Sequence, residues 1–562
     1  MKTRKNIVRL LSMLVCYLSA AYVHGQNLES ISTAKPFEIK GNLSARAIFF
    51  DVNGRDTYRE PFTWLLQGSP TVYLYGIAIP INIVVSEQER DFRQPFNRFG
   101  ISPEYKWAKL HVGYQNLQFS RYSLAGHAMV GAGVELNPGK LRFAYMRGQL
   151  LRAVQATPFI EDQDFRVLTS FKRTGDIVKI GYGTEDNYVD VIALKGRDII
   201  SSLDSIPDNL TPSENLVMSF VTRQTLFKKL RLDVEYAESY FTDDIRSESI
   251  TGDGDVLRPF DLFFDERTST RRSAAVNGSL QYQGDVFFGG VEYERIDPDY
   301  RSMGAYFFLN DIQRYTVTPG VKLFKNKVSI KTSYGYQENN LDQSKDQRTI
   351  RKISGAFITA RFGDVYQFSG NYSNYGVEQR QVFEAADPAL EIAQVTRQWS
   401  MNHTLSFQSE THMHNINLNI NQQNLNDDNE FTKEFSDYTS STYSANYMVS
   451  FLNSKLTANA GFTYSGFDVA QQDITFLGPN LGINKSFLEN KLQLSFNGTY
   501  FVNQMDAETI REITRLTLRT SYRVNKSQRL SLRGQFGKNE FNEDPERSFE
   551  EIKMEISYGY RF

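Results

Sequence analysis

The sequence predicts an all-β protein, a closed antiparallel transmembrane β-barrel of about 26 strands, with 24 as the alternative. Three observations predict this fold class. Apolar and polar residues alternate with a period of two from about residue 37 to the end of the chain. Short turns alternate with longer polar loops along the same stretch. The last strand alternates without a break and ends on phenylalanine.

The first 25 residues are predicted to be a signal peptide. Four basic side chains open the segment, and a short apolar stretch, residues 10–18, follows. Val23–Gly25 then offers a small-residue cleavage site before Gln26. Lipid anchoring at Cys16 is the alternative, and the bulky Val15 in front of it disfavours that. We therefore expect an exported protein that is cleaved near Gly25/Gln26.

Beyond the leader we expect a short periplasmic segment, residues 26–36, and one barrel domain, residues 37–562. After residue 30 no stretch approaches the roughly 18 apolar residues of a transmembrane helix. A net charge of −2 provides no basic field for nucleic-acid binding. The single cysteine lies in the leader, so the mature chain has no disulfide and no thiolate metal site.

The stretch Asn415–Asn421 shows the alternation most clearly, because one face is aliphatic and the other is entirely asparagine. In a soluble sandwich the aliphatic face would meet a second sheet. Here nearly every strand carries such a face, and no helical segment is available to cover them. A closed barrel places lipid on the apolar face and water on the polar one, and it leaves no sheet edge.

Turns and loops set the predicted strand order. Short turns are expected near residues 69, 108, 138, 185, 228, 284, 325, 363, 410, 453, 489 and 526. Longer loops are expected near 54–60, 89–98, 120–127, 152–165, 198–214, 244–269, 298–310, 341–348, 378–395, 426–437, 468–472, 505–510 and 541–546. Both termini then lie at the short-turn edge, which predicts short periplasmic turns and longer extracellular loops.

The carboxyl-terminal strand resembles the terminal signal of outer-membrane proteins, which the barrel-assembly machinery recognises. Its apolar register ends on Tyr558, Tyr560 and Phe562. The amino-terminal third resembles outer-membrane proteins of the Bacteroidota. That resemblance rests on Tyr75–Ile77, Pro95–Pro103, Tyr105–Trp107, Gly126–His127 and Gly131–Gly139. It implies the barrel fold and the cell outer membrane of a Gram-negative bacterium.

Charged residues gather on the predicted inner face of the last strands. These lumen-facing candidates are Arg515, Arg519, Arg523, Arg533, Glu551, Lys553, Glu555 and Arg561. A positive strip could attract anionic solutes or lipid headgroups. Alternatively the acids neutralise the arginines in a salt-bridge ladder along the wall, which is the interpretation we favour.

No catalytic residue, cofactor or metal site is predicted. His412 and His414 share a strand face, but no third metal ligand lies near them in the sequence. Gly126–His127 alone does not indicate the Ser, His and acid arrangement of a hydrolase. Asp253–Asp255 is predicted to be a solvated turn, because a calcium-binding loop alternates more oxygen ligands than these two carboxylates. The same loop carries Phe260 and Phe264, which would fold into the lumen or meet a partner.

A lumen of this width would leak, so something is expected to fill it. Only about ten residues separate the cleavage site from the first strand, so no separate plug domain is expected. The first hypothesis is a porin-like transport or export barrel, occluded by its own loops or by a partner. The second is a non-conducting scaffold that anchors a surface or secretion complex, and a barrel hydrolase comes third. The expected partners are outer-membrane lipid, the barrel-assembly machinery and a plug lipoprotein or periplasmic protein, with no nucleic acid.

Overall fold

The computed structural model describes residues 35–74, 77–81, 83–86, 100–102, 104–155, 169–250, 264–305, 308–382, 391–469 and 472–562. The predicted signal peptide, most of the segment 26–36 and the Asp253–Asp255 turn lie outside these ranges. Within them, no helix has both the length and the apolar character needed to cross a membrane.

Almost all regular structure belongs to one sheet of thirty segments. The first nine are β1 (Phe37–Lys40), β2 (Asn42–Asn53), β3 (Phe62–Gly68), β4 (Thr71–Leu74), β5 (Ile77–Pro80), β6 (Ile83–Ser86), β7 (Gly100–Ile101), β8 (Glu104–Tyr105) and β9 (Ala108–Gln115). Eight follow as β11 (Met129–Leu136), β12 (Leu141–Leu151), β13 (Lys172–Gly183), β14 (Tyr188–Ile199), β15 (Glu214–Leu226), β16 (Leu230–Thr242), β17 (Thr270–Gln283) and β18 (Phe287–Ile296).

The remaining thirteen are β20 (Ile312–Leu323), β21 (Val328–Asn339), β22 (Gln347–Phe362), β23 (Tyr366–Gln381), β24 (Ile392–Gln408), β25 (His412–Asp427), β26 (Tyr438–Phe451), β27 (Leu456–Val469), β28 (Gln472–Phe487), β29 (Leu492–Met505), β30 (Glu508–Arg523), β31 (Gln528–Phe541) and β32 (Phe549–Arg561). Outside the sheet are β10 (Leu124–Ala125), β19 (Gly304–Ala305), the helical turn α3 (Lys433–Ser436) and two 3₁₀ turns, η2 (Ile200–Ser202) and η5 (Pro545–Arg547).

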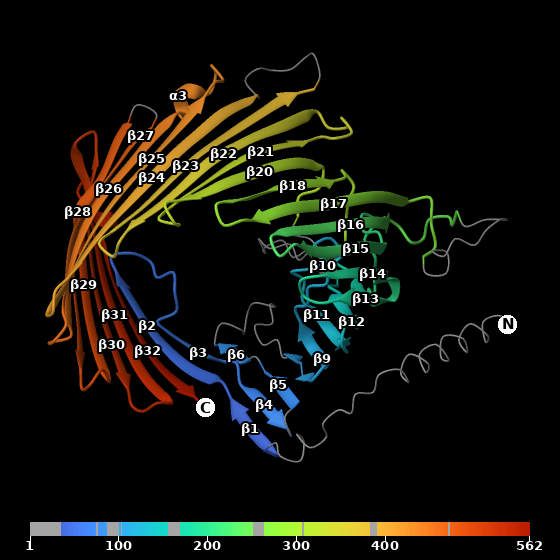
Figure 1. Ribbon diagram of the computed structural model, residues 1–562, viewed down its shortest axis with the longest axis horizontal. Helices are drawn as coiled ribbons and strands as arrows, with labels where there is room; N and C mark the ends of the chain where they lie inside the picture. The colour runs from blue at the N-terminus through green and yellow to red at the C-terminus, as the bar shows by residue number, and fades with distance from the viewer. Residues whose placement is uncertain are drawn as a thin grey trace.

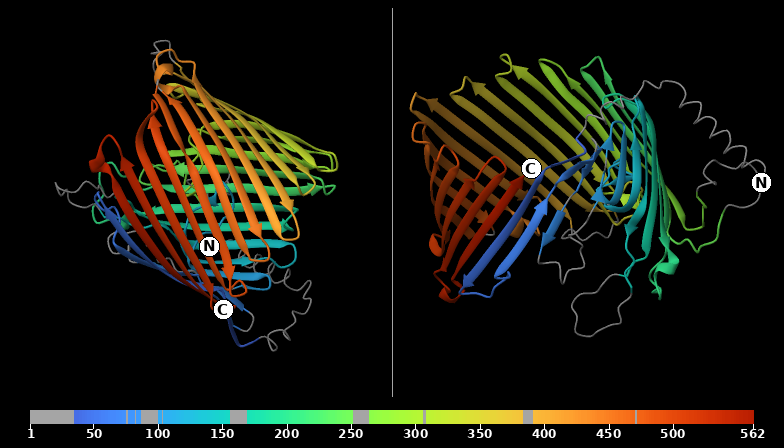
Figure 2. Two further views of the ribbon diagram at one scale, coloured as in Figure 1. Left: turned by 90° about the vertical axis from the view of Figure 1, so that its left-hand side faces the viewer. Right: turned by 90° about the horizontal axis from the view of Figure 1, so that it is seen from below.

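The strands follow one another in chain order as antiparallel neighbours around a curved wall (Figure 1), and the long later strands run obliquely side by side (Figure 2). The first and last strands meet, because β2 pairs with β32 from Asn42↔Arg561 to Asn53↔Glu550. On the other side of the amino-terminal strands, β5 joins β8 through the pair Ala78↔Glu104. Closure of the sheet and the exact number of strands stay predictions.

Eleven of the twelve predicted short turns are found within a few residues of their expected places, and the turn at residue 69 is wrong. β3 pairs with β2 and β4 pairs with β1, so both segments run along the same neighbouring strand. Residues 69–70 therefore interrupt a strand instead of reversing it. Pro70 explains the interruption, because proline has no N–H to donate to the ladder. The reversal comes later, between the paired Leu74 and Ile77.

Two of the predicted long loops are tight turns. β27 and β28 stay paired up to Val469↔Gln472, and β29 and β30 stay paired up to Met505↔Glu508. In the second turn Asp506 and Ala507 have φ values of 50° and 69°. That left-handed backbone suits a two-residue hairpin turn, whose twist matches that of the flanking strands. Polar residues beside these turns, Asp468, Gln472, Glu508 and Thr509, belong to the strands themselves.

Candidate functional site: the inner face of the sheet

The two faces of the sheet differ in chemistry all the way round. Residues paired on neighbouring strands share a face, and the register carries the face of the β25 asparagines round the sheet to that of Leu194, which packs with Leu124 of β10. We call this the inner face, because β10 lies within the curve of β13 to β16 (Figure 1). The outer face exposes large apolar side chains on early and late strands alike. Examples are Val191, Phe220, Leu280, Val317, Leu418, Tyr443, Phe496 and Ile556. An exposed apolar band opposite a polar face is typical of strands in contact with lipid.

Two loops fold onto the inner face of strands β11 to β20, which we call the covered wall. They are residues 116–128, which contain β10, and residues 297–305 with 308–311, which contain β19. The two loops hold each other through a short parallel pairing, Leu124↔Gly304 and Ala125↔Ala305.

An apolar core fills the space between these loops and the covered wall. Its buried members are Tyr122, Leu124, Met129, Met146, Leu150, Ile177, Ile192, Leu194, Val217, Ala237, Ala275, Ile296, Tyr300, Met303 and Ile312. The rings of Tyr122 and Tyr300 meet edge to face with centroids 6.0 Å apart. Met303 lies over Gly196, where an added Cβ would come within 2.9 Å of the Met303 Cβ. A glycine at position 196 thus lets the loop approach the wall.

Polar side chains of the covered wall hold the loop backbone in place. The Glu235 carboxylate accepts the N–H groups of Arg121 and Tyr122 at 3.2 and 3.0 Å. The Asn215 carbonyl oxygen accepts the N–H of Met303 at 3.0 Å. Each of these bonds satisfies a backbone group that the packing has removed from water, so the loops are built into the wall.

Glu294 is the charged centre of this packing and is 1 % exposed. Its carboxylate forms ion pairs with Arg121 of the loop at 2.7 Å and Arg314 of β20 at 2.8 Å. The Tyr122 hydroxyl donates to the same carboxylate at 2.9 Å. Burial, and next the negative charge of Glu294, raise the pKa of Tyr122 well above its usual range. Tyr122 therefore stays a hydrogen-bond donor at every physiological pH.

Arginines on the covered wall are matched by carboxylates of other strands: Arg142 of β12 reaches over β13 to Asp190 of β14, and the other pairs join neighbouring strands. The pairs, besides Arg314–Glu294, are Arg142–Asp190 at 2.8 Å, Arg173–Asp198 at 2.8 Å and Arg223–Asp233 at 2.6 Å. Partial burial makes such pairing necessary, because an unpaired buried charge is strongly destabilising.

From β21 to β31 the inner face is polar in a different way, and we call it the open wall. All members of the apolar core lie between residues 122 and 312, on the other side. Here amides and hydroxyls bond to one another across strands: Asn417 donates to Asn402 at 3.2 Å and Asn415 to Ser406 at 2.9 Å. On β24 to β26 these neutral groups make a hydrophilic surface.

At the end of the open wall, six guanidinium groups form what we call the arginine strip. Its members are Arg511, Arg515, Arg519 and Arg523 of β30 and Arg529 and Arg533 of β31. Register places Arg519 opposite Arg533 and Arg523 opposite Arg529. Among the residues that the structure describes, none of the six has a carboxylate oxygen within 4.0 Å. Arg511 donates to Asn539, while the Nε atoms of Arg511 and Arg533 are buried and have no hydrogen-bond partner.

The expected salt-bridge ladder is therefore wrong for the arginines of β30 and β31. The acids of β32 turn to the other side: Glu555 pairs with Arg46 of β2 at 3.2 Å and Glu551 with Arg55 at 3.4 Å. Glu555 stands opposite Arg533 in register but finds its partner across the β2–β32 junction. Which of two neighbouring strands supplies a partner depends on side-chain direction, and the alternation does not encode it.

The other candidates on β32 divide between the two faces. Arg561 stands opposite Asn42, and Lys553 stands opposite Phe50 and Gln535, all on the inner face. Tyr558 and Tyr560 share the outer face. The backbone of Phe562 exchanges two hydrogen bonds with Gly41, at 3.0 and 3.1 Å. The last residue is thus tied to the first strand, and recognition by an assembly machinery stays a prediction.

One Ser–His–Glu arrangement was not found from the sequence. Ser102 Oγ lies 2.9 Å from His111 Nδ1, and His111 Nε2 lies 2.8 Å from Glu135 Oε1. The serine hydroxyl, however, donates to Gln115 Oε1 at 3.0 Å, and His111 is 2 % exposed. A nucleophile needs its proton directed at the base and room for a substrate, so this geometry does not favour hydrolysis. The three residues are 9 and 24 positions apart in the chain, and strand pairing brings their side chains together.

The other residues considered from the sequence have ordinary contacts. His414 Nδ1 lies 2.7 Å from the Tyr447 hydroxyl, and His412 stacks on the His414 ring. No group of three or more metal-ligating side chains occurs in the described ranges. Phe264 is buried and packs against Tyr240, a side chain of the outer face, rather than in the lumen.

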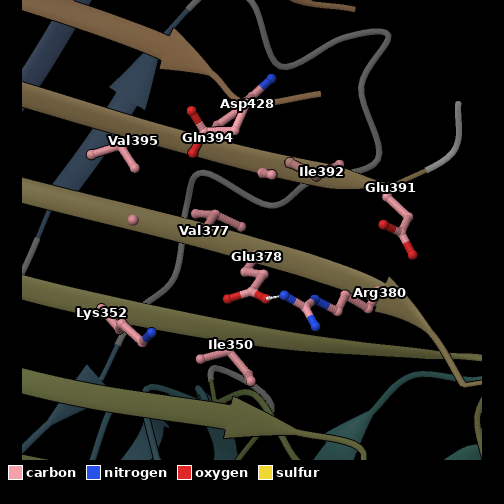
Figure 3. A pocket seen from close by; sticks show the side chains of 12 residues that line it. Ile350, Lys352, Val377, Glu378, Arg380, Glu391, Ile392, Gln394, Val395 and Asp428 are labelled. Atoms are coloured by element: carbon pink, nitrogen blue, oxygen red, sulfur yellow. Dashed lines mark ion pairs between the residues drawn. The ribbon is translucent and has the colours of Figure 1, made fainter. Parts of the chain in front are cut away.

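A hollow of about 470 Å³ lies at the long-loop edge of β22 to β24 (Figure 3). Lys352, Val377 and Gln394 line it, together with the ion pair Glu378–Arg380. It is partly open and mixed in character. Its geometry supports no particular ligand.

Comparison with known proteins adds only low similarities. No family model matches the chain, and no curated protein matches it. Among solved structures, the P pilus usher (PapC) translocation pore shares 10 % identity over 93 % of this chain and 99 % of its own, with a TM-score of 0.36. OprD of Pseudomonas aeruginosa shares 10 % over 72 % and 97 %, with a TM-score of 0.30.

The outer membrane protein opdK of Pseudomonas aeruginosa shares 12 % identity over 70 % of this chain and 100 % of its own, with a TM-score of 0.31. Similarities of this size do not identify a function. The resemblance to Bacteroidota proteins stays a prediction. The functional argument therefore rests on the residues of this chain.

Proposed function

We propose that the chain is an outer-membrane transport barrel whose sheet closes with 26 strands. The thirty segments reduce to 26 when β1 and β2, β3 and β4, β5 and β6, and β7 and β8 are each counted as one interrupted strand. Pairing of β2 with β32 and the exposed apolar outer face support this arrangement. The edge of the sheet with the short turns, where the chain both enters and leaves the barrel, faces the periplasm. The longer loops are extracellular.

One observation carries the transport function: the two inward-folded loops cover one wall only. The core beneath them ends at Ile312, while the wall from β21 to β31 presents amides, hydroxyls and guanidinium groups. A scaffold without conduction has no need of a hydrophilic inner surface of that extent. A barrel of this width conducts ions unless its lumen is blocked. Loops that cover one wall narrow the lumen but leave an aqueous path along the other wall.

Planar-bilayer recording on the purified full-length protein tests this function. We expect discrete single-channel steps in wild type and a larger conductance when the covering loops are loosened by Tyr300→Ala. Tyr300→Phe is the matched control, because it keeps the ring and removes only the hydroxyl that donates to the Tyr122 carbonyl at 3.0 Å. Absence of conductance in all three folded proteins would overturn the transport function and favour the scaffold.

A further inference from the structure

The arginine strip has no charge partner in the folded chain, although the same fold supplies partners elsewhere. On the covered wall, Arg142, Arg173 and Arg223 each reach a carboxylate within 2.8 Å. On β30 and β31, the described residues offer no carboxylate within 4.0 Å of any of the six arginines. Both sets are arginines on the inner face of the sheet. They differ in whether a carboxylate of another strand lies within reach.

The register also brings like charges face to face. Arg519 is directly opposite Arg533, and Arg523 is opposite Arg529. Side chains opposite each other on paired strands have Cβ atoms about 5 Å apart, and like charges in that position destabilise the sheet. An anion held between two guanidinium groups removes that repulsion and supplies the missing hydrogen-bond acceptors.

Geometry and access suit a small oxyanion. Arg519 is exposed on the inner face and Arg533 is half-buried, with an Nε that has no partner. The planar guanidinium fork matches the oxygens of a carboxylate or phosphate and binds them in pairs. Along β30 the arginines recur every fourth residue, about 13 Å apart, and so mark successive positions through the wall.

We infer that the arginine strip binds soluble oxyanions, carboxylates or phosphates, and makes the barrel selective for anionic solutes. The inference rests on the proposed transport function for its selectivity, but the binding step stands on the strip alone. A lipid headgroup is the less suitable source of the anion. The strip lies on the inner face, opposite the apolar residues Leu516 and Leu518 of the same strand, which are exposed on the outer face.

Two measurements on the full-length protein separate binding from transport. The first records the unfolding temperature in detergent with sodium phosphate or with sodium chloride at equal ionic strength, so that charge screening is the same in both. Because a ligand that binds only the folded state raises its stability, we expect a phosphate-dependent increase in wild type. The second records the reversal potential across a phosphatidylcholine bilayer under a potassium chloride gradient, which we expect to show anion preference.

The test variant is Arg519→Gln with Arg533→Gln, and the matched control is Arg397→Gln. Arg397 is exposed on β24, opposite Asn374, in the register of the outer face. We expect the double variant to weaken phosphate binding by about ten-fold or more, because two charge-assisted contacts are lost. Its anion preference should fall as well, while the control should match wild type. Arg519→Lys with Arg533→Lys should keep the anion preference but weaken phosphate binding, because lysine lacks the fork.

The outcomes separate the inference from the proposed function. Conductance with the same anion preference and the same phosphate response in wild type and the glutamine variant would overturn the inference and leave transport standing. A phosphate response that disappears in the glutamine variant, in a protein that never conducts, would support the binding site and overturn transport. Repeating the recording with phosphatidylglycerol added tests the lipid source. A selectivity that depends on this anionic lipid would overturn the assignment to soluble anions.

Discussion

The covered wall and the open wall are both built from antiparallel strands, but their inner faces differ. The inner face of the covered wall is apolar and packed under loops, whereas that of the open wall is polar. β11, on the covered wall, has 8 residues, and β24, on the open wall, has 17. Inner positions carry Met129, Met146 and Leu194 on the first wall, and asparagine, serine and arginine on the second. Outer positions are apolar on both. The outer side thus has the same apolar character on both walls, while the inner side differs with what the chain places against it.

Charge shows the same contrast. Where loops exclude water, each arginine has a carboxylate, because an unpaired charge there would be strongly destabilising. Where no loop covers the inner face, water solvates the arginines. They need no carboxylate partner there and are available to bind a solute. A substitution on one wall can therefore be compared with a matched substitution on the other.

The largest expected effect is the difference between Glu294, which is buried on the covered wall, and Glu555 of β32, which pairs with Arg46 across the β2–β32 junction. Glu294→Ala should destabilise the loop packing by about 3–5 kcal/mol, because it removes the buried carboxylate that Arg121, Arg314 and the Tyr122 hydroxyl share. Arg314 would keep only Glu292, at 3.3 Å. Glu555→Ala should cost about 1 kcal/mol or less, since the Glu555 side chain is 19 % exposed whereas that of Glu294 is 1 % exposed. Limited proteolysis of the 116–128 loop and thermal unfolding measure the two effects. Equal losses would contradict the contrast between the buried pair under the loops and the exposed pair at the β2–β32 junction.

Tyr122→Phe should loosen the same packing by about 1.5–3 kcal/mol at neutral pH, the range for a hydrogen bond to a charged group. Because burial raises the pKa of Tyr122, the wild-type advantage is fully present below the usual tyrosine pKa of 10.0. Above that pH it falls, because only the unfolded state releases the proton. Proteolysis of the loop in wild type and variant between pH 7 and 11 checks this. A gap that widens with rising pH would contradict it.

Gly196→Ala should destabilise the covered wall by about 1–3 kcal/mol, because the new methyl group would meet Met303 at 2.9 Å. The matched change on the other side is Gly534→Ala in β31, where an added Cβ finds no atom within 4 Å. That variant should be neutral or slightly stabilising, because alanine restricts the unfolded chain. Thermal unfolding of both variants distinguishes them. A larger loss at position 534 would refute the close approach of the loop.

The smallest effect is expected for the neutral ladder of the open wall. Asn417→Ala removes bonds to Asn402 and Thr404 at 3.2 and 3.1 Å in a half-buried setting. The expected loss is about 0.5–1.5 kcal/mol, because water replaces the lost partners. Ion selectivity should not change. A loss comparable to that of Glu294→Ala would mean that the open wall is packed against something as well.

Much of the fold was predictable because alternation is a local signal. Ile416, Leu418 and Ile420 indicate one face of a strand without knowledge of any neighbour. The turn at residue 69 failed for the same reason: Ser69 and Pro70 look like a turn, and only the pairing of β3 and β4 with one strand shows an interruption. The tight turn at Asp506 was missed because polar residues at a strand end resemble a loop.

The candidate site divides in the same manner. The sequence by itself determined which side of β30 and β31 carries Arg515, Arg519, Arg523 and Arg533, since side chains two residues apart share a face. Only the tertiary structure decided their electrostatic state, by directing Glu551 and Glu555 toward Arg55 and Arg46 of the first strand region. It also brought Tyr122 to Glu294, 172 residues away, and so covered one wall while leaving the other open. Contacts of that range depend on how the whole sheet curves, and no local pattern of residues records it.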